Sequence, residues 1–309
     1  MARAALPGPV GERASHSAPS PARIALASAR SILSRTSGFI ASAGFTHSLS
    51  PARNCLFGCT YCYVPTLRVR AGLKPADWRH WGHHTTHKSN AADLLRRQLR
   101  PSQVIYCSPL VDPYQPSERQ VRGMPPILRA LCKTPPAAFV LQTRGCLILR
   151  DLGLLRELAA KTQLGVSFSL TTDREDVRRF YEPHCDPIED RVRTIRALEE
   201  AGIPVHCTLA PILPCNPERL ADLALECSSR AVIADPLHTR QGKPLGAVTR
   251  PEALRISRVR GFQRWHDLSF QRDIVGVVRR RVEAAGRAFG VGIEGFRMLA
   301  PSGERLGAG

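Results

Sequence analysis

The sequence predicts an α/β fold, in which a parallel sheet of about six β/α units forms a partial barrel like an incomplete TIM barrel. Short β-branched and apolar runs alternate with amphipathic stretches, which is the pattern of βαβ units. Proline or glycine separates several of these runs, as between a helix and the following strand at Pro101. Six units are fewer than the eight that close a TIM barrel, so we expect an open barrel.

The elements follow from these patterns in chain order. The expected strands lie at residues 45–48, 103–107, 138–143, 164–170, 203–209 and 231–233. The expected helices lie at residues 90–99, 125–131, 152–160 and 188–200, the last of which ends at Gly202. In parallel β/α folds, ligands bind outside the carboxyl ends of the strands, so functional residues are expected there.

Composition divides the 309 residues into three parts. Residues 1–40 are rich in Ala, Pro, Ser and Arg, and we expect a disordered tail. The partial barrel is expected at 41–240, and a basic helical extension packed on it at 241–309. No apolar stretch approaches the ~20 residues that cross a bilayer, so no membrane contact is expected. Seven of the ten cysteines are scattered singly, which is typical of a reducing compartment, so the expected location is cytoplasmic.

The formal net charge is +18, from 44 Lys and Arg against 26 Asp and Glu. Such a balance favours a polyanionic partner such as nucleic acid. The cationic residues are mostly arginines, with abundant Ala, Pro and Gly beside them, which a GC-rich genome also produces. Nucleic-acid binding and a purely compositional origin of the charge both stay open.

Three cysteines lie close together, at Cys55, Cys59 and Cys62. The spacing C-x3-C-x2-C lets one short loop wrap three thiolates around a compact metal centre, and Gly58 permits a tight turn. Soft thiolates select zinc or iron–sulfur centres. Fully ligated iron–sulfur clusters use four cysteines, so three would leave one iron open for a ligand.

This cysteine motif, with the aromatic Tyr61 before its last cysteine, resembles the signature of the radical S-adenosylmethionine (SAM) superfamily. The resemblance implies that Cys55, Cys59 and Cys62 ligate a [4Fe-4S] cluster whose open iron binds SAM. It implies reductive cleavage of SAM to a 5′-deoxyadenosyl radical, which abstracts hydrogen from a substrate. An electron donor such as flavodoxin or ferredoxin would then be a partner, and Tyr61 would lie beside the adenine.

A zinc site is the alternative. His80, His83, His84 and His87 follow the cysteines and offer a fourth ligand. On that interpretation the chain is a zinc-stabilised nucleic-acid-binding protein without catalysis. Zinc ribbons usually bring cysteines in separated pairs, and no second pair follows here.

Later segments resemble the spore photoproduct lyase-like branch of the superfamily. Residues 112–118 read D-P-Y-Q-P-S-E, Glu182-Pro183 precedes a helix, and residues 201–204 lead into Ala210-Pro211. The resemblance runs in order from about residue 48 to about residue 235. It makes a lyase of the DNA-repair type, acting on a DNA photolesion, one candidate; a modified RNA, a peptide or a metabolite stays open as substrate.

SAM has a methionine end, a ribose diol and an adenine, each of which needs contacts at the strand ends. We expect Ser108 and Asp112 near the methionine ammonium, and Ser167 and Ser169 near the ribose or the carboxylate. Ordinary loop capping by Ser and Asp is the alternative for all four. Two further contacts are expected: Arg174 with the SAM carboxylate, unless it is a surface arginine, and Ala210 with the adenine by shape.

Cys107 ends the second expected strand, at about the place where the resemblance to spore photoproduct lyase implies a cysteine that returns a hydrogen atom to the product radical. Cys107 is therefore a candidate hydrogen donor. The neighbouring sequence, Cys-Ser-Pro-Leu-Val-Asp, differs from that of the lyase, and the favoured interpretation is a buried packing cysteine.

Overall fold

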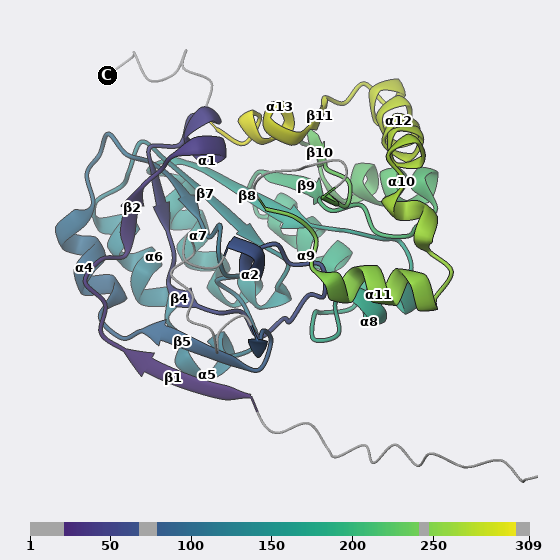
Figure 1. Ribbon diagram of the computed structural model, residues 1–309. Helices are drawn as coiled ribbons and strands as arrows, with labels where there is room; N and C mark the ends of the chain where they lie inside the picture. The colour runs from purple at the N-terminus through teal and green to yellow at the C-terminus, as the bar shows by residue number, and fades with distance from the viewer. Residues whose placement is uncertain (1–21, 68–78, 241–246, 301–309) are drawn as a thin grey trace, which may run out of the picture.

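The computed structural model describes residues 22–67, 79–240 and 247–300, and its main sheet has eight strands (Figure 1). Their order is β11-β10-β9-β8-β7-β6-β3-β2, and all neighbours are parallel except β2 and β3. In chain order the strands are β2 (Leu33–Arg35), β3 (His47–Leu49), β6 (Val104–Cys107), β7 (Ala138–Thr143), β8 (Gln163–Ser169), β9 (Val205–Leu209), β10 (Val232–Ala234) and β11 (Phe289–Val291).

The main sheet is an open barrel, as the sequence predicts. β11 and β2 are its two edges, and no described strand joins them. The six expected strands correspond to β3, β6, β7, β8, β9 and β10. β11 adds a seventh parallel strand beside β10, and β2 adds an antiparallel strand beside β3. The sequence analysis missed both because each has only three residues, too few to show a period of two.

Helices cover the outer face of the barrel. Alternate strand residues such as Phe139, Leu141 and Val166 point outward and form one hydrophobic core with the helices. The helices of this layer are α4 (Ala91–Gln98), α6 (Met124–Lys133), α7 (Leu152–Ala159), α9 (Ile188–Glu200), α10 (Pro217–Cys227) and α12 (Leu268–Ala284). The helices expected at residues 90–99, 125–131, 152–160 and 188–200 are α4, α6, α7 and α9.

The inner face of the barrel is apolar where the strands begin. Val104, Tyr106 and Val140 point inward, opposite to their outward-facing neighbours, and pack with Phe45. Phe296 of α13 (Gly292–Arg297) packs against this group, with its ring centre 4.8 Å from that of Tyr106. The C-terminal segment therefore closes the amino end of the barrel, next to α1 (Gly38–Ser42) in Figure 1.

A second, three-stranded sheet has the order β1-β5-β4, with β1 (Arg23–Ala27), β4 (Ala52–Arg53) and β5 (His84–Lys88). The structure thus differs from the prediction of a disordered tail over residues 1–40, because β1 and β2 lie within it. β1 is mostly exposed and is held by main-chain pairing with β5. Its side chains therefore show no pattern from which an ordered strand could be predicted. Residues 1–21 of that expected tail lie outside the described residues.

The remaining helices are short or lie over the strand ends: α2 (Val64–Leu67), α5 (Glu118–Val121), α8 (Glu175–Tyr181) and α11 (Pro251–Val259), with 3-10 turns at Cys146–Asp151 and Gln263–His266. No helix among the described residues has the length and apolar character needed to span a bilayer. The domain limits expected at residues 40 and 240 stay a prediction.

We predict that Gly295→Ala destabilises the protein by about 1–3 kcal/mol, because an added methyl group overpacks a tight contact. A Cβ atom at Gly295 would lie 2.6 Å from the carbonyl carbon and oxygen of Gly290, where β11 meets α13. Urea denaturation measures the loss. Gly153→Ala on α7 is the control, because its Cβ would meet no atom within 4 Å, and it should be neutral or slightly stabilising. Equal stability of both variants would contradict the close packing of β11 on α13.

Candidate metal and cofactor site

The three clustered cysteines lie on one loop at the carboxyl edge of the main sheet, between β4 and α2. Cys55 and Cys59 are buried and Cys62 is half-buried, and all three are free thiols. Gly58 has φ +61°, and a Cβ there would meet the Cα of Gly82 at 3.3 Å. A glycine is therefore required at the turn for both its conformation and its close approach. The cysteine loop therefore lies at the carboxyl ends of the strands, where the sequence analysis expects functional residues.

Gln115 holds this cysteine loop in place. Its side chain is fully buried, and its Oε1 accepts a hydrogen bond of 2.7 Å from the backbone N–H of Leu56. Its Nε2 donates to the carbonyl of Asn54 at 3.3 Å and to Oγ1 of Thr85 on β5 at 3.1 Å. The glutamine of the D-P-Y-Q-P-S-E segment thus ties the start of the cysteine loop to the small sheet, a role that the sequence analysis missed.

The acids of the same segment join neighbouring elements. The Asp112 carboxylate accepts hydrogen bonds from Thr143 Oγ1 at 2.7 Å and from the N–H groups of Arg144 at 2.8 Å and Tyr114 at 2.9 Å. Asp112 therefore bridges the ends of β6 and β7, and burial raises its pKa. Glu118 accepts from the Met124 N–H at the start of α6 at 2.9 Å and from Arg150 at 2.8 Å. The segment acts as a scaffold behind the cysteine loop.

A buried carboxylate, Glu182, lies beneath the cysteine loop and joins four elements. It forms ion pairs of 2.5 Å with Arg144, which follows β7, and with Arg191 of α9. The Tyr61 hydroxyl of the loop donates a hydrogen bond to the same carboxylate, and the Thr171 hydroxyl donates another at 2.8 Å. Burial alone would raise the pKa of Glu182, but the charges of Arg191 and Arg144 outweigh it and lower the pKa from 4.5 to about 2.

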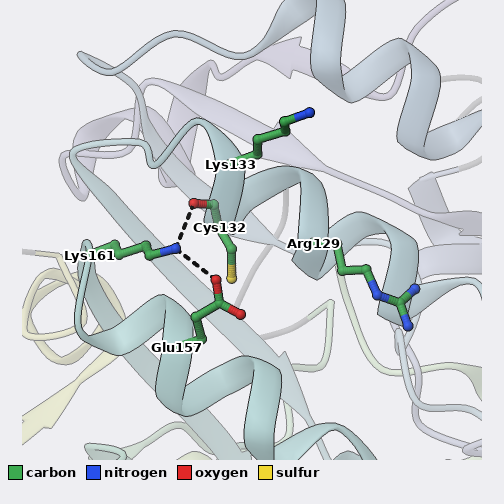
Figure 2. A pocket seen from close by; sticks show the side chains of 5 residues that line it. All are labelled: Arg129, Cys132, Lys133, Glu157 and Lys161. Atoms are coloured by element: carbon green, nitrogen blue, oxygen red, sulfur yellow. Dashed lines mark hydrogen bonds and ion pairs between the residues drawn. The ribbon is translucent and has the colours of Figure 1, made fainter.

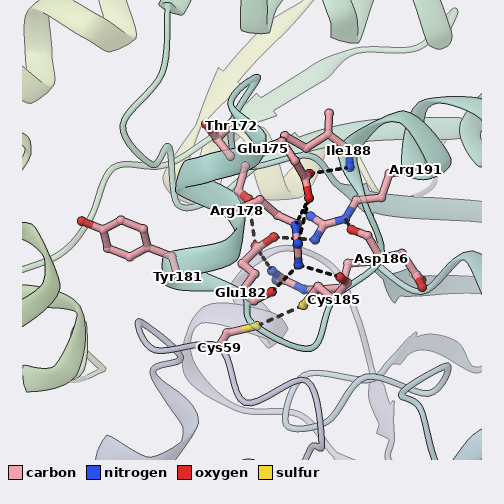
Figure 3. Close-up of polar contacts among 12 residues, drawn as sticks. Cys59, Thr172, Glu175, Arg178, Tyr181, Glu182, Cys185, Asp186, Ile188 and Arg191 are labelled. Carbon is pink, nitrogen blue, oxygen red and sulfur yellow. Dashed lines mark hydrogen bonds and ion pairs between the residues drawn. The ribbon is translucent and has the colours of Figure 1, made fainter. Parts of the chain in front are cut away.

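A fourth thiol, Cys185, lies beside the cysteine loop (Figure 3). Its Sγ is 3.7 Å from the Sγ of Cys59. Arg178 of α8 fixes the backbone around it, by donating to the carbonyls of Cys185 at 2.9 Å and Glu182 at 3.0 Å. The hydrogen bond with Cys185 is the largest influence on the thiol of Cys59 and lowers its pKa. In the sequence Cys185 is one of the scattered cysteines, and its position three residues after Glu182 is the only local signal of this role.

The donor set fits an iron–sulfur cluster. Burial raises the pKa of Cys55, and it raises that of Cys62 to about 12, so these thiols need a metal to become thiolates. No three His, Cys, Asp or Glu side chains among the described residues are gathered as around a single metal ion. In a four-iron cluster each thiolate binds a different iron, so its three cysteines need not meet at one point.

Two histidines of the zinc alternative have described side-chain partners other than a cysteine. His87 contacts the Ser117 hydroxyl at 2.8 Å, and His84 contacts the Asn54 side chain. Burial lowers the pKa of His87 to about 4. His80 and His83 share a hydrogen bond between their main chains. The histidine segment thus lies against the cysteine loop, through His84 with Asn54 and Gly82 with Gly58, while the partners described for the His84 and His87 side chains are not cysteines.

The residues expected to contact SAM lie at the strand ends, but most of them bond within the protein. Ser108 donates to the Leu49 carbonyl at 3.3 Å, and Ser167 pairs with Thr208 at 2.6 Å. Ser169 differs, because its hydroxyl is buried and has no hydrogen-bond partner in the structure. Gly165, Ser167 and Ser169 alternate with the outward-facing residues of β8 and so line the inner face.

The remaining expected residues are placed as follows. Arg174 is half-exposed, pairs with Asp176 at 2.7 Å and lies 5.5 Å over the ring of Phe262. These contacts favour the alternative of a surface arginine over a contact with SAM. Ala210 follows β9 at the carboxyl edge. Arg144, which the analysis missed, also follows a strand and lies beside Tyr61.

Cys107 is fully buried and belongs to the core between the sheet and the outer helices, with Ile105 and Leu141. Burial raises its pKa to about 12. Its position supports the interpretation of a packing cysteine.

A cavity of about 280 Å³ lies away from the cysteine loop, between α6 and α7 (Figure 2). Its lining residues are Arg129, Cys132, Lys133, Glu157 and Lys161, and Lys161 pairs with Glu157 at 2.7 Å. The cavity lies in the outer helix layer and shares no residue with the site described above.

We predict that Glu182→Gln destabilises the protein by about 3–5 kcal/mol at neutral pH, because two buried arginines lose their counter-charge. The Glu182 pKa is lower in the folded state, so its contribution is present above pH 4.5 and is lost as the pH falls toward about 2. Urea unfolding should therefore show a difference between wild type and variant at pH 7 that shrinks by pH 3. Glu189→Gln, an exposed change on α9, is the control, and a difference independent of pH would contradict this assignment.

Residues 49–227, more than half of the chain, match the family model of the radical SAM superfamily. An uncharacterised protein of Mycobacterium tuberculosis is 29% identical over 174 residues, which cover 55% of this chain and 50% of that protein. An uncharacterised protein of Acidianus two-tailed virus is 29% identical over 180 residues, covering 56% of this chain and 58% of that protein.

The match spans about half the length of the mycobacterial relative. Among solved structures, spore photoproduct lyase complexed with dinucleoside spore photoproduct is similar, with a TM-score of 0.56 and 14% sequence identity. That likeness covers 87% of this chain and 81% of the lyase, and at this identity it shows the fold alone. With the match to the family model over the cysteine loop and the strands that follow it, the chain belongs to the radical SAM superfamily.

Proposed function

We propose that the protein is a radical SAM enzyme whose [4Fe-4S] cluster is ligated by Cys55, Cys59 and Cys62. When bound, the cluster would supply the electron that cleaves SAM reductively and so generate a 5′-deoxyadenosyl radical for hydrogen abstraction. The single observation that carries this proposal is the position of the C-x3-C-x2-C loop at the carboxyl edge of an open parallel sheet, within a superfamily match.

The chain's own residues would set the geometry of that site. Gln115 fixes the start of the cysteine loop, and Glu182 with Arg144 fixes Tyr61. We assign Ser169 to SAM binding because its buried hydroxyl has no hydrogen-bond partner in the structure, and an unpaired buried hydroxyl is costly unless a ligand completes it. Ser108, Ser167 and Asp112 have partners in the protein, so they would support the site by holding the strand ends.

The polar inner face supports a substrate site next to the cysteine loop. Inward-facing residues change from Val104 and Val140, where the strands begin, to Gln142, Ser167 and Thr208 nearer their carboxyl ends. A polar lining over the carboxyl ends is where β/α folds bind ligands. We propose that the substrate enters over this face and meets the radical there, away from bulk water.

A DNA photolesion is the candidate substrate, which makes the enzyme a lyase of the DNA-repair type. Two observations favour it: the fold likeness to spore photoproduct lyase, and the net charge of +18. A cytoplasmic location and an electron donor such as flavodoxin or ferredoxin complete the proposal.

The test of substrate is anaerobic turnover of the reconstituted protein with dithionite and SAM, with and without UV-irradiated DNA. The proposed activity predicts that irradiated DNA raises deoxyadenosine formation and loses its lesions, whereas unirradiated DNA does neither. If irradiated DNA keeps its lesions and leaves turnover unchanged while SAM is still cleaved, the repair substrate is wrong and the radical SAM activity stands.

We predict that Cys55→Ala, Cys59→Ala or Cys62→Ala each abolishes cluster assembly, because each removes one of only three thiolate ligands. Iron content after anaerobic reconstitution should fall from about four per chain to near zero. Cys132→Ala, in the outer helix layer, is the control and should keep its iron. Retention of the cluster in any one of the three loop variants would assign a ligand role to another residue, with Cys185, whose Sγ lies 3.7 Å from that of Cys59, the first candidate.

We predict that Cys107→Ala leaves iron content and the rate of SAM cleavage unchanged and lowers only stability. The expected loss is about 1–2 kcal/mol, from a small cavity in the core between the sheet and the outer helices. Urea denaturation and a deoxyadenosine assay without substrate measure the two properties. A Cys107→Ala protein that still consumes substrate but releases a different product would instead show the hydrogen-donor role.

A further inference from the structure

A groove of about 300 Å³ lies between α8 and α11. We call it the α8–α11 groove, and it is lined by Arg179, Phe180, Arg255, Ile256, Val259 and Arg260. Half of its lining is apolar and half is arginine. Val259 is 70% exposed, so it leaves apolar surface open beside the arginines. Such a mixture of arginine, aromatic and aliphatic side chains is typical of the core of a protein–protein interface.

Two of the three arginines of the groove carry charge that no described acid neutralises, whereas Arg179 pairs with Glu175 at 3.4 Å. Arg255 and Arg260 form no ion pair within the described part of the chain, and the Arg260 guanidinium lies 3.9 Å over the ring of Phe180. The neighbouring acid on α11, Glu252, pairs with Arg250 at 2.9 Å. Uncompensated arginines held at an apolar groove favour a partner with acidic side chains.

The groove is connected directly to the cysteine loop. The carbonyl of Tyr181, the residue after Phe180, accepts hydrogen bonds from the backbone N–H of Thr60 at 2.9 Å and from its hydroxyl at 3.2 Å. Thr60 follows Cys59 in the sequence. The Tyr181 hydroxyl contacts Ser257 Oγ of α11 at 2.6 Å, so both helices of the groove are fixed to the same residue.

The floor of the groove also packs on the same hydrophobic core as the thiols. Phe180 and Ile256 contact the core that contains Cys55, Cys59 and Cys185. A partner in the groove would therefore lie one residue and one hydrogen bond from the loop that holds the proposed cluster. An electron carrier needs this proximity to the proposed cluster, whereas a site that only binds anions does not.

We propose that the α8–α11 groove is the docking surface for an acidic one-electron carrier protein, with a flavin or an iron–sulfur group as its redox centre. The proposal rests on the proposed function, which requires one electron for each SAM cleaved. In the transfer the carrier is oxidised by one electron and the cluster is reduced by one, and no bond forms or breaks. Interfaces of electron-transfer partners are small and transient, which suits a short groove of complementary charge.

A polynucleotide is the other acidic partner, and the groove favours it less. Nucleic-acid binding depends on a row of phosphate contacts along an extended basic surface. Half of this groove is aliphatic or aromatic and its length is short, which suits a small protein contact better than a row of phosphates.

The test compares two reductants on one variant, Arg255→Glu with Arg260→Glu. With a purified acidic flavodoxin as reductant at low salt, we expect deoxyadenosine formation to fall at least tenfold. With dithionite, which needs no docking surface, the rate should stay within twofold of wild type. Arg272→Glu with Arg280→Glu on α12 is the control, with the same change of charge on exposed arginines, and should behave as wild type with both reductants.

Three results would overturn the docking surface: an unchanged flavodoxin-dependent rate, an equal loss with both reductants, or an equal loss in the α12 control. Direct titration of flavodoxin, by calorimetry at low salt, tests docking without turnover, and the groove variant should lose binding that the control keeps. If wild type binds flavodoxin in this way but never cleaves SAM with dithionite, docking stands and the proposed function fails. A groove variant that keeps flavodoxin binding but loses binding to DNA would assign the groove to nucleic acid.

Discussion

The buried charge of Glu182 is the interaction on which the site depends. One carboxylate holds the hydroxyl of Tyr61 on the cysteine loop, and it pairs with Arg144 at the end of β7 and Arg191 on α9. The group carries one negative and two positive charges, and its excess positive charge lies beside the thiols. A set of thiolates on a metal centre would be stabilised by that charge. The same contacts thus hold the cysteine loop in place and put positive charge beside its thiols.

Two further sets of contacts position the loop from either side. Gln115 attaches its first residues to the small sheet, and Tyr181 of α8 attaches its middle through Thr60. The loop is therefore held by the Gln115 side chain and the Tyr181 carbonyl, which come from distant parts of the sequence. The inner face of the barrel and the α8–α11 groove lie next to this loop, so a substrate and a reductant could approach it by separate routes.

Much of the fold could be predicted from the sequence, since its signals are local. β7, in which five of six residues are apolar or β-branched, and α9, with a clear amphipathic pattern before Gly202, are predicted at the bounds observed or close to them. β1 could not be predicted, because its stability comes from main-chain pairing with β5 and four of its five residues are exposed. β11 is too short to show a period and depends on its contact with α13.

The site was predictable where a motif carries its own chemistry, as in Cys55, Cys59 and Cys62. It was not predictable where a role depends on a distant partner: Gln115, Arg144 and Cys185 have functions only through residues 30 to 126 positions away. The measurement that tests the central claim is Mössbauer spectroscopy of ⁵⁷Fe-reconstituted protein, before and after addition of SAM. The account predicts a four-iron cluster in which one iron changes its parameters when SAM binds. A protein without such a cluster, or a cluster in which no iron changes its Mössbauer parameters when SAM is added, would contradict it.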